Sequence, residues 1–248
     1  MSAAHAEARR ASDANPAWYH SIELASGVVT PGQVDLRGLA ARVLPVDLSG
    51  LRALDVGTFD GFWAFELERR GAQVIAIDVE RLEAAEWPPL SRERLEREGR
   101  ERDVELGRGF ELAAGALGSA VERRLVSVYE LSPEAVDGPV DLAFSGAIML
   151  HLRDPVRALE RIASALSAGG ELRLLEPFSP RLTLLSPRRP AASFGAAVEG
   201  FTWWLPNLAA LGGWLRAAGL RDERRLAVFR PPRRGAIRHW QAAYAARR

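Results

Sequence analysis

Short apolar runs alternate with segments of helical pattern along most of the chain. Runs rich in Val, Ile, Leu and Phe, most of them bounded by Gly, Pro or Asp, are predicted to be strands over residues 52–57, 73–79, 124–130, 140–146 and 171–177. Strands that alternate with helices favour a mostly parallel sheet with helices on both faces and right-handed crossovers. The pattern therefore predicts an α/β fold.

Two helices are predicted in more detail. Asp154 is suited to be an N-cap and Pro155 to be the first helical residue, and the helix is expected to stop at Gly169–Gly170. Its apolar stripe consists of Val156, Leu159, Ile162 and Leu166. A second helix within residues 91–105 is predicted to be exposed, because its charges alternate in sign.

Composition excludes several kinds of chemistry. The 248 residues include no cysteine, which excludes disulfides, thiolate metal sites and a cysteine nucleophile, and all 33 basic residues are arginine. Without lysine there is neither a P-loop lysine nor a Schiff-base lysine. No run of 18 apolar residues and no secretory signal is seen, so we expect a cytoplasmic protein with no membrane partner. No Asp/His/Glu set has metal-ligand spacing, so no metal is expected.

Charge is distributed unevenly. Residues 216–248 contain ten arginines and two acids, a net charge of +8, whereas the rest of the chain carries −7. Such a basic end is suited to bind phosphate. We favour the simpler interpretation, in which the arginines protect late edge strands and keep the C-terminus solvated.

The stretch LDVGTFDGFW, residues 54–63, follows the first predicted strand. Ligands of doubly wound sheets lie at the carboxyl ends of the strands, beside the first strand. A dinucleotide fingerprint starting at Gly57 needs glycine at positions 59 and 62, and both are Phe. The spacing D-x-G-x-G-x-G is intact at Asp55, Gly57 and Gly61 instead. It resembles the first signature of class I S-adenosylmethionine (SAM) methyltransferases.

This resemblance implies a set of cofactor-binding residues. The turn places Thr58 and Phe59 beside the cofactor, and Asp55 accepts from its amino group. Asp78, at the end of the next strand, is expected to accept from the ribose hydroxyls. The remaining positions assigned to the cofactor, most of them around the adenine, are Val79, Tyr129, Glu130 and Ser145.

A more specific resemblance links the chain to the methyltransferases related to those that modify the wobble uridine of tRNA. This group also contains enzymes that act on small molecules. The matching segments are residues 18–35, 54–79, 110–122, 128–134 and 146–162. The resemblance implies a Rossmann-like sheet of seven strands in the order 3-2-1-4-5-7-6, with the seventh antiparallel. The last two strands are expected within residues 223–231 and 237–246.

The domain organisation follows from this comparison. Residues 1–47 are expected to form an N-terminal arm that caps the cofactor site, and residues 48–248 the SAM-binding domain. Residues 178–207 are expected to form a lid or substrate wall, because the stretch from Pro177 to Pro206 contains five prolines after a core strand.

The resemblance also offers two cofactors. The tRNA-modifying members transfer a carboxymethyl group from a carboxylated SAM, and their counterpart of the arm carries cations. Here no arginine lies between Arg10 and Arg37, so a buried carboxylate would lack a partner in the arm. We therefore expect ordinary methyl transfer from SAM, with S-adenosyl-L-homocysteine as product. An arginine from elsewhere in the chain, such as Arg153, would reverse this expectation if it reached the cofactor.

Two histidines are candidates for a catalytic base. His151 follows the fourth strand, beside the expected site, and its ordinary pKa of about 6.5 suits proton removal at neutral pH. A structural histidine bonded to a backbone carbonyl is the alternative. His20 is the second candidate, because Trp18, Tyr19 and His20 belong to the arm; Trp18 is assigned to the cofactor and Tyr19 to the substrate, with ordinary packing as the alternative for both.

The acceptor side is predicted less specifically. Glu176 is a candidate substrate contact or helper, and its alternative role is a salt-bridge or capping acid. Trp203 and Trp204 are suited to face a flat aromatic acceptor or to be packed in the core. Three functions remain: a SAM-dependent O-methyltransferase of small molecules, which we favour; a tRNA-modifying transferase; and a non-catalytic SAM-binding module.

Overall fold

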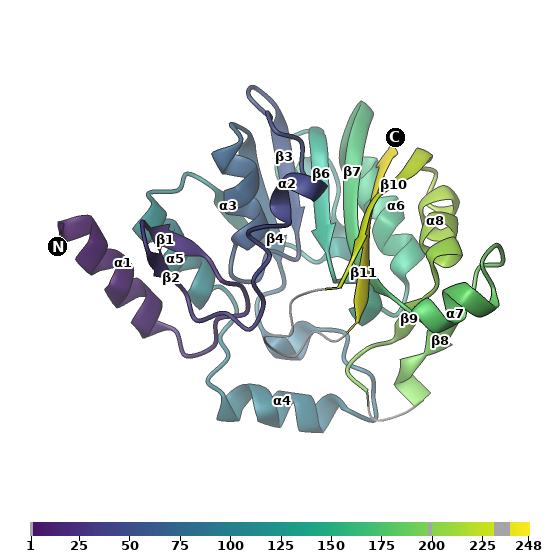
Figure 1. Cartoon of the computed structure of the whole chain (residues 1–248), viewed down its shortest axis with the longest axis horizontal. Coiled ribbons are helices and arrows are strands. Elements are labelled where there is room, and N and C mark those ends of the chain that lie inside the picture. Colours follow the sequence, from purple (N-terminus) through teal and green to yellow (C-terminus); the bar gives the residue numbers. More distant parts are fainter. Residues whose placement is uncertain (1, 198–199, 231–238) are drawn as a thin grey trace.

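The centre of the molecule is a seven-stranded sheet (Figure 1). The computed structural model describes residues 2–197, 200–230 and 239–248. The strands of the sheet are β3 (Arg52–Val56), β4 (Gln73–Asp78), β5 (Glu122–Leu125), β6 (Val140–Gly146), β7 (Leu166–Phe178), β10 (Arg221–Phe229) and β11 (Trp240–Arg247). Their order is β5-β4-β3-β6-β7-β11-β10, and β11 is antiparallel to both of its neighbours. Counted within this sheet, that is the predicted order 3-2-1-4-5-7-6, which is confirmed.

Helices cover both faces of the sheet, as predicted. They are α1 (Ala3–Ala14), α2 (Ala40–Val43), α3 (Phe62–Arg69), α4 (Arg92–Glu101), α5 (Arg108–Leu117), α6 (Pro155–Ala165), α7 (Pro180–Leu185) and α8 (Leu208–Ala217). Side chains of β3 alternate between two cores: Ala53 belongs to the core under α3 and α5, and Leu54 to the core under α6 and α8. Successive side chains of the strand point to opposite faces of the sheet, so β3 contributes to the core on each face.

The predicted helix after residue 154 has the expected start. The Asp154 carboxylate accepts the backbone N–H of Arg157 at 3.0 Å, and Pro155 opens α6. The prediction of its end was wrong, because β7 already begins at Leu166 and contains both glycines. Leu166 pairs with Val140 of β6, and this long-range pairing prevails over the local helical pattern.

The third core strand is shorter and earlier than predicted. β5 ends at Leu125, and residues Val128–Glu130 form a short 3-10 helix, η2. The ladder between β4 and β5 stops where Asp78 is paired with Leu125. Because β4 ends at Asp78, the following residues have no strand to pair with, and the chain turns toward the carboxyl edge of the sheet.

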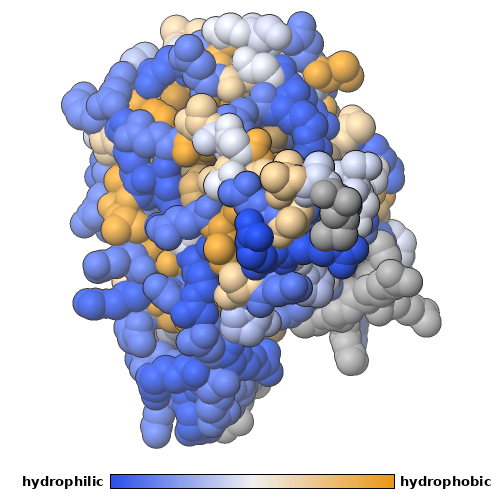
Figure 2. Space-filling view, turned by 90° about the vertical axis from the view of Figure 1, so that its left-hand side faces the viewer, coloured by the Kyte–Doolittle hydropathy of each residue, from blue (hydrophilic) through white to orange (hydrophobic). Residues whose placement is uncertain are grey.

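The first part of the N-terminal segment packs on α5, whereas α2 contacts β10. Helix α1 packs on α5, and the hairpin of β1 (Glu23–Ala25) and β2 (Val28–Val29) contacts α1 as well. The face that carries these elements is mostly hydrophilic (Figure 2), and the charged helix α4 projects at its lower end.

The segment predicted as a lid, 178–207, contains α7 and a hairpin of β8 (Ala192–Phe194) and β9 (Trp204–Pro206). Residues 198–199 of this segment lie outside the described residues. The two late strands occur as β10 and β11, and residues 231 and 237–238 of the predicted ranges also lie outside the described part.

Candidate active site

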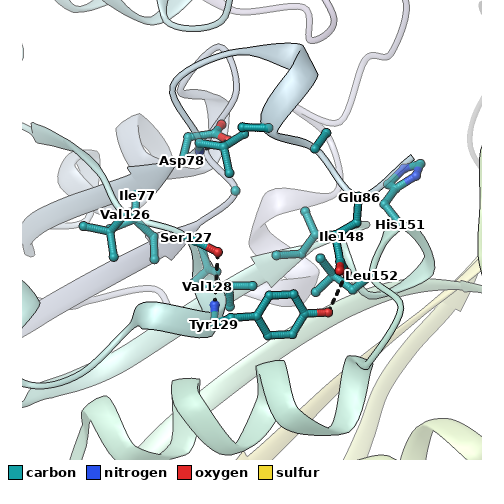
Figure 3. A pocket seen from close by; sticks show the side chains of 15 residues that line it. Ile77, Asp78, Glu86, Val126, Ser127, Val128, Tyr129, Ile148, His151 and Leu152 are labelled. Carbon is teal, nitrogen blue, oxygen red and sulfur yellow. Dashed lines mark hydrogen bonds between the residues drawn. The ribbon is translucent and has the colours of Figure 1, made fainter. Parts of the chain in front are cut away.

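A cavity opens at the carboxyl ends of β3 and β4, where the topology predicts a ligand (Figure 3). It encloses about 650 Å³, including the part open to solvent. Strand ends, η2, the segment 84–86 and the turn after β6 form its wall, which consists of Val56, Gly57, Ile77, Asp78, Val79, Ala84, Ala85, Glu86, Val126, Ser127, Val128, Tyr129, Ile148, His151 and Leu152. The wall is mostly apolar, with a few polar groups at its two ends, as is usual for small-molecule sites.

Asp78 forms one end of this cavity. Its two carboxylate oxygens accept the backbone N–H groups of Phe59 at 2.8 Å and Val79 at 2.7 Å. Burial raises the pKa of Asp78, and these donors together with Arg123 partly offset the rise. Each carboxylate oxygen can accept a second hydrogen bond, so Asp78 is placed to bind hydroxyl groups in the cavity.

The glycine turn has an unusual backbone at Phe59. Phe59 has a φ of 49°, between Gly57 at 76° and Gly61 at 88°. A side chain in this left-handed region is strained, on the order of 1 kcal/mol or more. The hydrogen bond from Phe59 N–H to Asp78 helps to hold it there. The turn therefore keeps the conformation of a glycine-rich loop although its middle glycine is replaced.

Three buried polar atoms beside the cavity have no hydrogen-bond partner among the described residues: Oδ2 of Asp55, Oγ1 of Thr58 and Oγ of Ser145. Asp55 and Ser145 lie on the adjacent strands β3 and β6, where Val56 pairs with Ser145. Burial raises the pKa of Asp55 to about 7, although Thr58 and His20 counteract the rise. The side chains of Asp55 and Ser145 point to opposite faces of the sheet, because Asp55 pairs with Phe144 and Ser145 with Val56. Unsatisfied buried polar atoms are costly, so each of these groups fits a polar ligand that would bond to it.

Tyr129 and Glu86 form the wall opposite Asp78 (Figure 3). The Tyr129 hydroxyl donates to Glu86 at 2.7 Å and accepts the Asp154 N–H at 3.1 Å. Burial, followed by the hydrogen bond to Glu86, raises the pKa of Tyr129. Tyr129 therefore stays neutral and is fixed as a wall. Glu130, assigned to the adenine from the sequence, is exposed and does not line the cavity.

His151 lies at the end of a short 3-10 helix, η4 (Met149–His151), and lines the cavity. Its Nδ1 is 3.1 Å from the carbonyl oxygen of Phe201, and a carbonyl can only accept, so Nδ1 carries the proton. The Nε2 lone pair then remains free in the neutral ring. Burial lowers the pKa of His151, which keeps the imidazole neutral at pH 7.

The arm residues lie beside the glycine turn rather than in the cavity. Trp18 is buried and donates from Nε1 to the Ser12 carbonyl at 2.8 Å. Asp60 accepts the backbone N–H groups of Tyr19 and His20 and also lies 2.6 Å from Nδ1 of His20. This single buried carboxylate thus attaches the arm to the turn. Asp60 was missed by sequence reasoning, although it stands inside the quoted motif.

Glu176, near the carboxyl end of β7, is buried and accepts the backbone N–H groups of Ile148 and Met149, each at 2.9 Å. Burial raises its pKa to about 8, while these donors pull it back. Glu176 therefore supports the turn that leads to His151. Its charge also contributes to the raised pKa of Tyr19, after burial and Asp60.

Both tryptophans of the hairpin are engaged by backbone carbonyls. Trp203 is buried and donates from Nε1 to the Glu86 carbonyl, whereas the half-buried Trp204 donates to the Arg153 carbonyl at 3.0 Å. Neither lines the cavity. Glu86, Ile148 and Leu152 do line it, and sequence reasoning missed them because their loops carry no pattern that distinguishes them from other loops.

Comparison with known proteins identifies the family. The family described as a methyltransferase domain matches residues 32–224. The chain belongs to the class I SAM-dependent methyltransferases. The matched range includes the glycine turn, Asp78, His151 and both hairpin tryptophans.

Several relatives of this methyltransferase domain are named. A tRNA U34 carboxymethyltransferase of Pseudomonas paraeruginosa is 32% identical over 188 residues, which cover 74% of this chain and 49% of that protein. A ubiquinone biosynthesis O-methyltransferase of Xanthomonas axonopodis pv. citri is 30% identical over 203 residues, 77% of this chain and 70% of the relative. The chain thus spans about half the length of the carboxymethyltransferases it matches.

Solved structures share the fold. The N-terminal domain of EvdMO1 with S-adenosylhomocysteine bound has a TM-score of 0.60 at 18% identity and covers 100% of this chain and 98% of that one. A 1,6-didemethyltoxoflavin-N1-methyltransferase of Burkholderia thailandensis has a TM-score of 0.51 at 20% identity, and the match covers 85% of this chain and 80% of that one.

In the described part of this chain, no helix is both long and apolar enough to cross a membrane.

Proposed function

We propose that this chain binds SAM and transfers its methyl group to an oxygen of a small molecule. The observation that carries the proposal is the cavity at the strand ends, with Asp78 at one end and unsatisfied buried oxygens on Asp55 and Thr58 at the adjoining glycine turn. In a chain of this family, those groups fit a ligand with ribose hydroxyls and an amino acid part.

The residues divide the binding of the cofactor among them. Asp78 accepts from the ribose hydroxyls, and Val79 and Tyr129 hold the adenine between an aliphatic and an aromatic wall. Asp55 and Thr58 receive the methionyl part, next to the left-handed turn of Gly57 and Phe59, and Ser145 lies beside Val56 of the cavity wall. The arm covers this end from the other side, because Asp60 fixes Tyr19 and His20 on the turn.

His151 is the proposed base. SAM, when bound, supplies a methyl group on a positively charged sulfur, which needs little further activation. With SAM bound, the acceptor oxygen would take the methyl group in exchange for the sulfur, and Nε2 of His151 would accept the proton of the acceptor hydroxyl. Alignment and proton removal are then the contributions of this chain.

His20 is the second candidate for the base. Its Nδ1 donates to Asp60, an arrangement that orients an imidazole in many catalytic sites, but His20 does not line the cavity. This position favours a role in holding the arm.

A tRNA-directed carboxymethyl transfer is the alternative, and the name of the Pseudomonas relative favours it. The position of Arg153 speaks against it. The guanidinium lies over the Trp203 ring, 4.9 Å from its centre, and Arg153 is not among the residues that line the cavity. A carboxylate added to the cofactor would have neither Arg153 nor an arm cation as a partner.

Two measurements test the proposal. Isothermal titration with S-adenosylhomocysteine, SAM and carboxylated SAM should show binding of the first two, and carboxylated SAM should bind no more tightly. Mass spectrometry of the product of an incubation with hydroxylated small molecules should show the mass of a methyl group. No binding of S-adenosylhomocysteine contradicts the cofactor assignment, and much tighter binding of carboxylated SAM favours the alternative.

A further inference from the structure

Two half-exposed aromatic rings belong to this part of the molecule: Phe201 contacts His151, and Phe194 contacts Trp203 and Trp204. Phe194 and Phe201 are 50% and 49% exposed, whereas Trp203 behind them is 6% exposed. The Phe201 ring lies 5.3 Å from the His151 ring, tilted by 34°. Exposed aromatic side chains next to a cavity mark a surface that a ligand covers.

The two tryptophans make this surface rigid. The ring of Phe194 lies 5.0 Å from Trp204 and 6.2 Å from Trp203, and both indole N–H groups are bonded to backbone carbonyls. On the other side, Trp87 meets the His151 ring edge-on at 6.4 Å. His151 is therefore flanked by the Phe201 and Trp87 rings, a setting that suits a flat molecule.

Arg153 supplies a positive charge at the same place. Its side chain is exposed, and no carboxylate of the described residues forms an ion pair with it. The acids around it are engaged: Glu86 accepts the Tyr129 hydroxyl and the Arg153 N–H, and Asp154 accepts the Arg157 N–H. The guanidinium, resting on the Trp203 ring, is thus available to an anion from outside.

We propose that the acceptor is a small aromatic molecule that carries both a hydroxyl group and an anionic group such as a carboxylate. Its ring lies against Phe201 and Phe194, its anion binds Arg153, and its hydroxyl faces Nε2 of His151. A nucleic acid would need several cations along its phosphates, whereas the anion of a small molecule needs only Arg153. This inference rests on the proposed function and names the substrate class of that site.

Matched pairs of phenols test it. The probes are 3,4-dihydroxybenzoate against catechol and 4-hydroxybenzoate against phenol, each titrated by calorimetry into the full chain saturated with S-adenosylhomocysteine. The carboxylate of each pair should bind about threefold to tenfold more tightly, because an exposed ion pair contributes modestly. An oligoribonucleotide titrated in the same way should bind more weakly than the carboxylates.

Variants assign the effect to residues. Arg153→Gln should remove the preference for the carboxylate and leave catechol unchanged, whereas Phe201→Ala should weaken both members of a pair. Arg161→Gln, an exposed arginine of α6, is the matched control and should change neither.

Some outcomes overturn the inference alone. They are equal affinity within each pair, the same loss for both members in Arg153→Gln, tighter binding of the oligoribonucleotide, or no binding of any pair while S-adenosylhomocysteine binds normally. Failure of S-adenosylhomocysteine itself to bind would instead overturn the proposed function.

Discussion

The two ends of the cavity are built in different ways. At the Asp78 end, the polar groups lie at the termini of adjacent parallel strands, and backbone N–H groups hold the carboxylate directly. At the His151 end, the polar groups lie on a short 3-10 helix that is positioned by Glu176, by the carbonyl of Phe201 and by aromatic rings from distant loops. The first end belongs to the sheet, and the second depends on contacts between loops.

This difference separates binding from turnover. A ligand at the Asp78 end meets groups that are fixed by the register of the sheet, whereas the position of the proposed base, His151, depends on the hairpin and on the segment around Glu86. Changes at one end should therefore affect the affinity for the cofactor, and changes at the other should affect the rate.

The largest effect is expected for the base. His151→Ala should lower the single-turnover rate about 10²- to 10⁴-fold for a weakly acidic hydroxyl and leave the affinity for S-adenosylhomocysteine near that of the wild type. His239→Ala, an exposed histidine, is the control. With a more acidic phenol the loss should shrink; an equal loss for both acceptors would indicate positioning rather than proton transfer.

At the other end, Asp78→Ala should weaken the binding of S-adenosylhomocysteine by about 1.5 to 3 kcal/mol, because a charged acceptor of two hydroxyl groups is lost. Calorimetric titration measures this change. Glu80→Gln, two residues away and exposed, should leave the affinity unchanged. Wild-type affinity in the Asp78 variant would refute the ribose assignment.

The stability that Glu176 contributes to the His151 end is expected to depend on pH. Burial raises its pKa from 4.5 to about 8, so the folded chain holds a proton that the unfolded chain releases above pH 4.5. Its contribution to stability is therefore complete below pH 4.5 and is lost as the pH rises toward 8. Between pH 5 and pH 8, the free energy of unfolding of the wild type should fall by on the order of 2 kcal/mol more than that of Glu176→Gln, as measured by denaturant unfolding.

Asp55, whose pKa is raised to about 7, also makes the stability fall as the pH rises, but it is present in both the wild type and Glu176→Gln. The difference between wild type and Glu176→Gln therefore isolates Glu176. If the two proteins respond to pH in parallel, Glu176 is ionised in the folded chain and the assigned direction is wrong.

The smallest effect is expected where the two ends meet. Tyr129→Phe removes the hydroxyl between Glu86 and the Asp154 N–H and should lower the free energy of unfolding by about 1 kcal/mol. It should also speed the dissociation of S-adenosylhomocysteine by a few-fold, as followed by stopped-flow tryptophan fluorescence. An unchanged dissociation rate together with the loss of stability would limit Tyr129 to a structural role.

Local pattern was enough to predict the Asp78 end. The alternating strands, the glycine spacing from Asp55 to Gly61 and the acid that ends the next strand follow each other closely in sequence, and the right-handed crossover brings them to one edge. The strand order was predicted through the family resemblance and is confirmed. Even here, only the structure shows that Phe59 takes the left-handed conformation, because its hydrogen bond to Asp78 spans 19 residues.

The His151 end was decided by tertiary structure. Trp203 and Trp204 were expected to face an acceptor or the core, and hydrogen bonds to Glu86 and Arg153, 117 and 51 residues away, hold them as a backing for other rings. Phe194, Phe201 and Asp60 carry no sequence signal of their own, since their importance comes from which side chains they meet. The sequence by itself therefore determined the sheet and the edge where a ligand lies, whereas only long-range packing decided which side chains face that ligand.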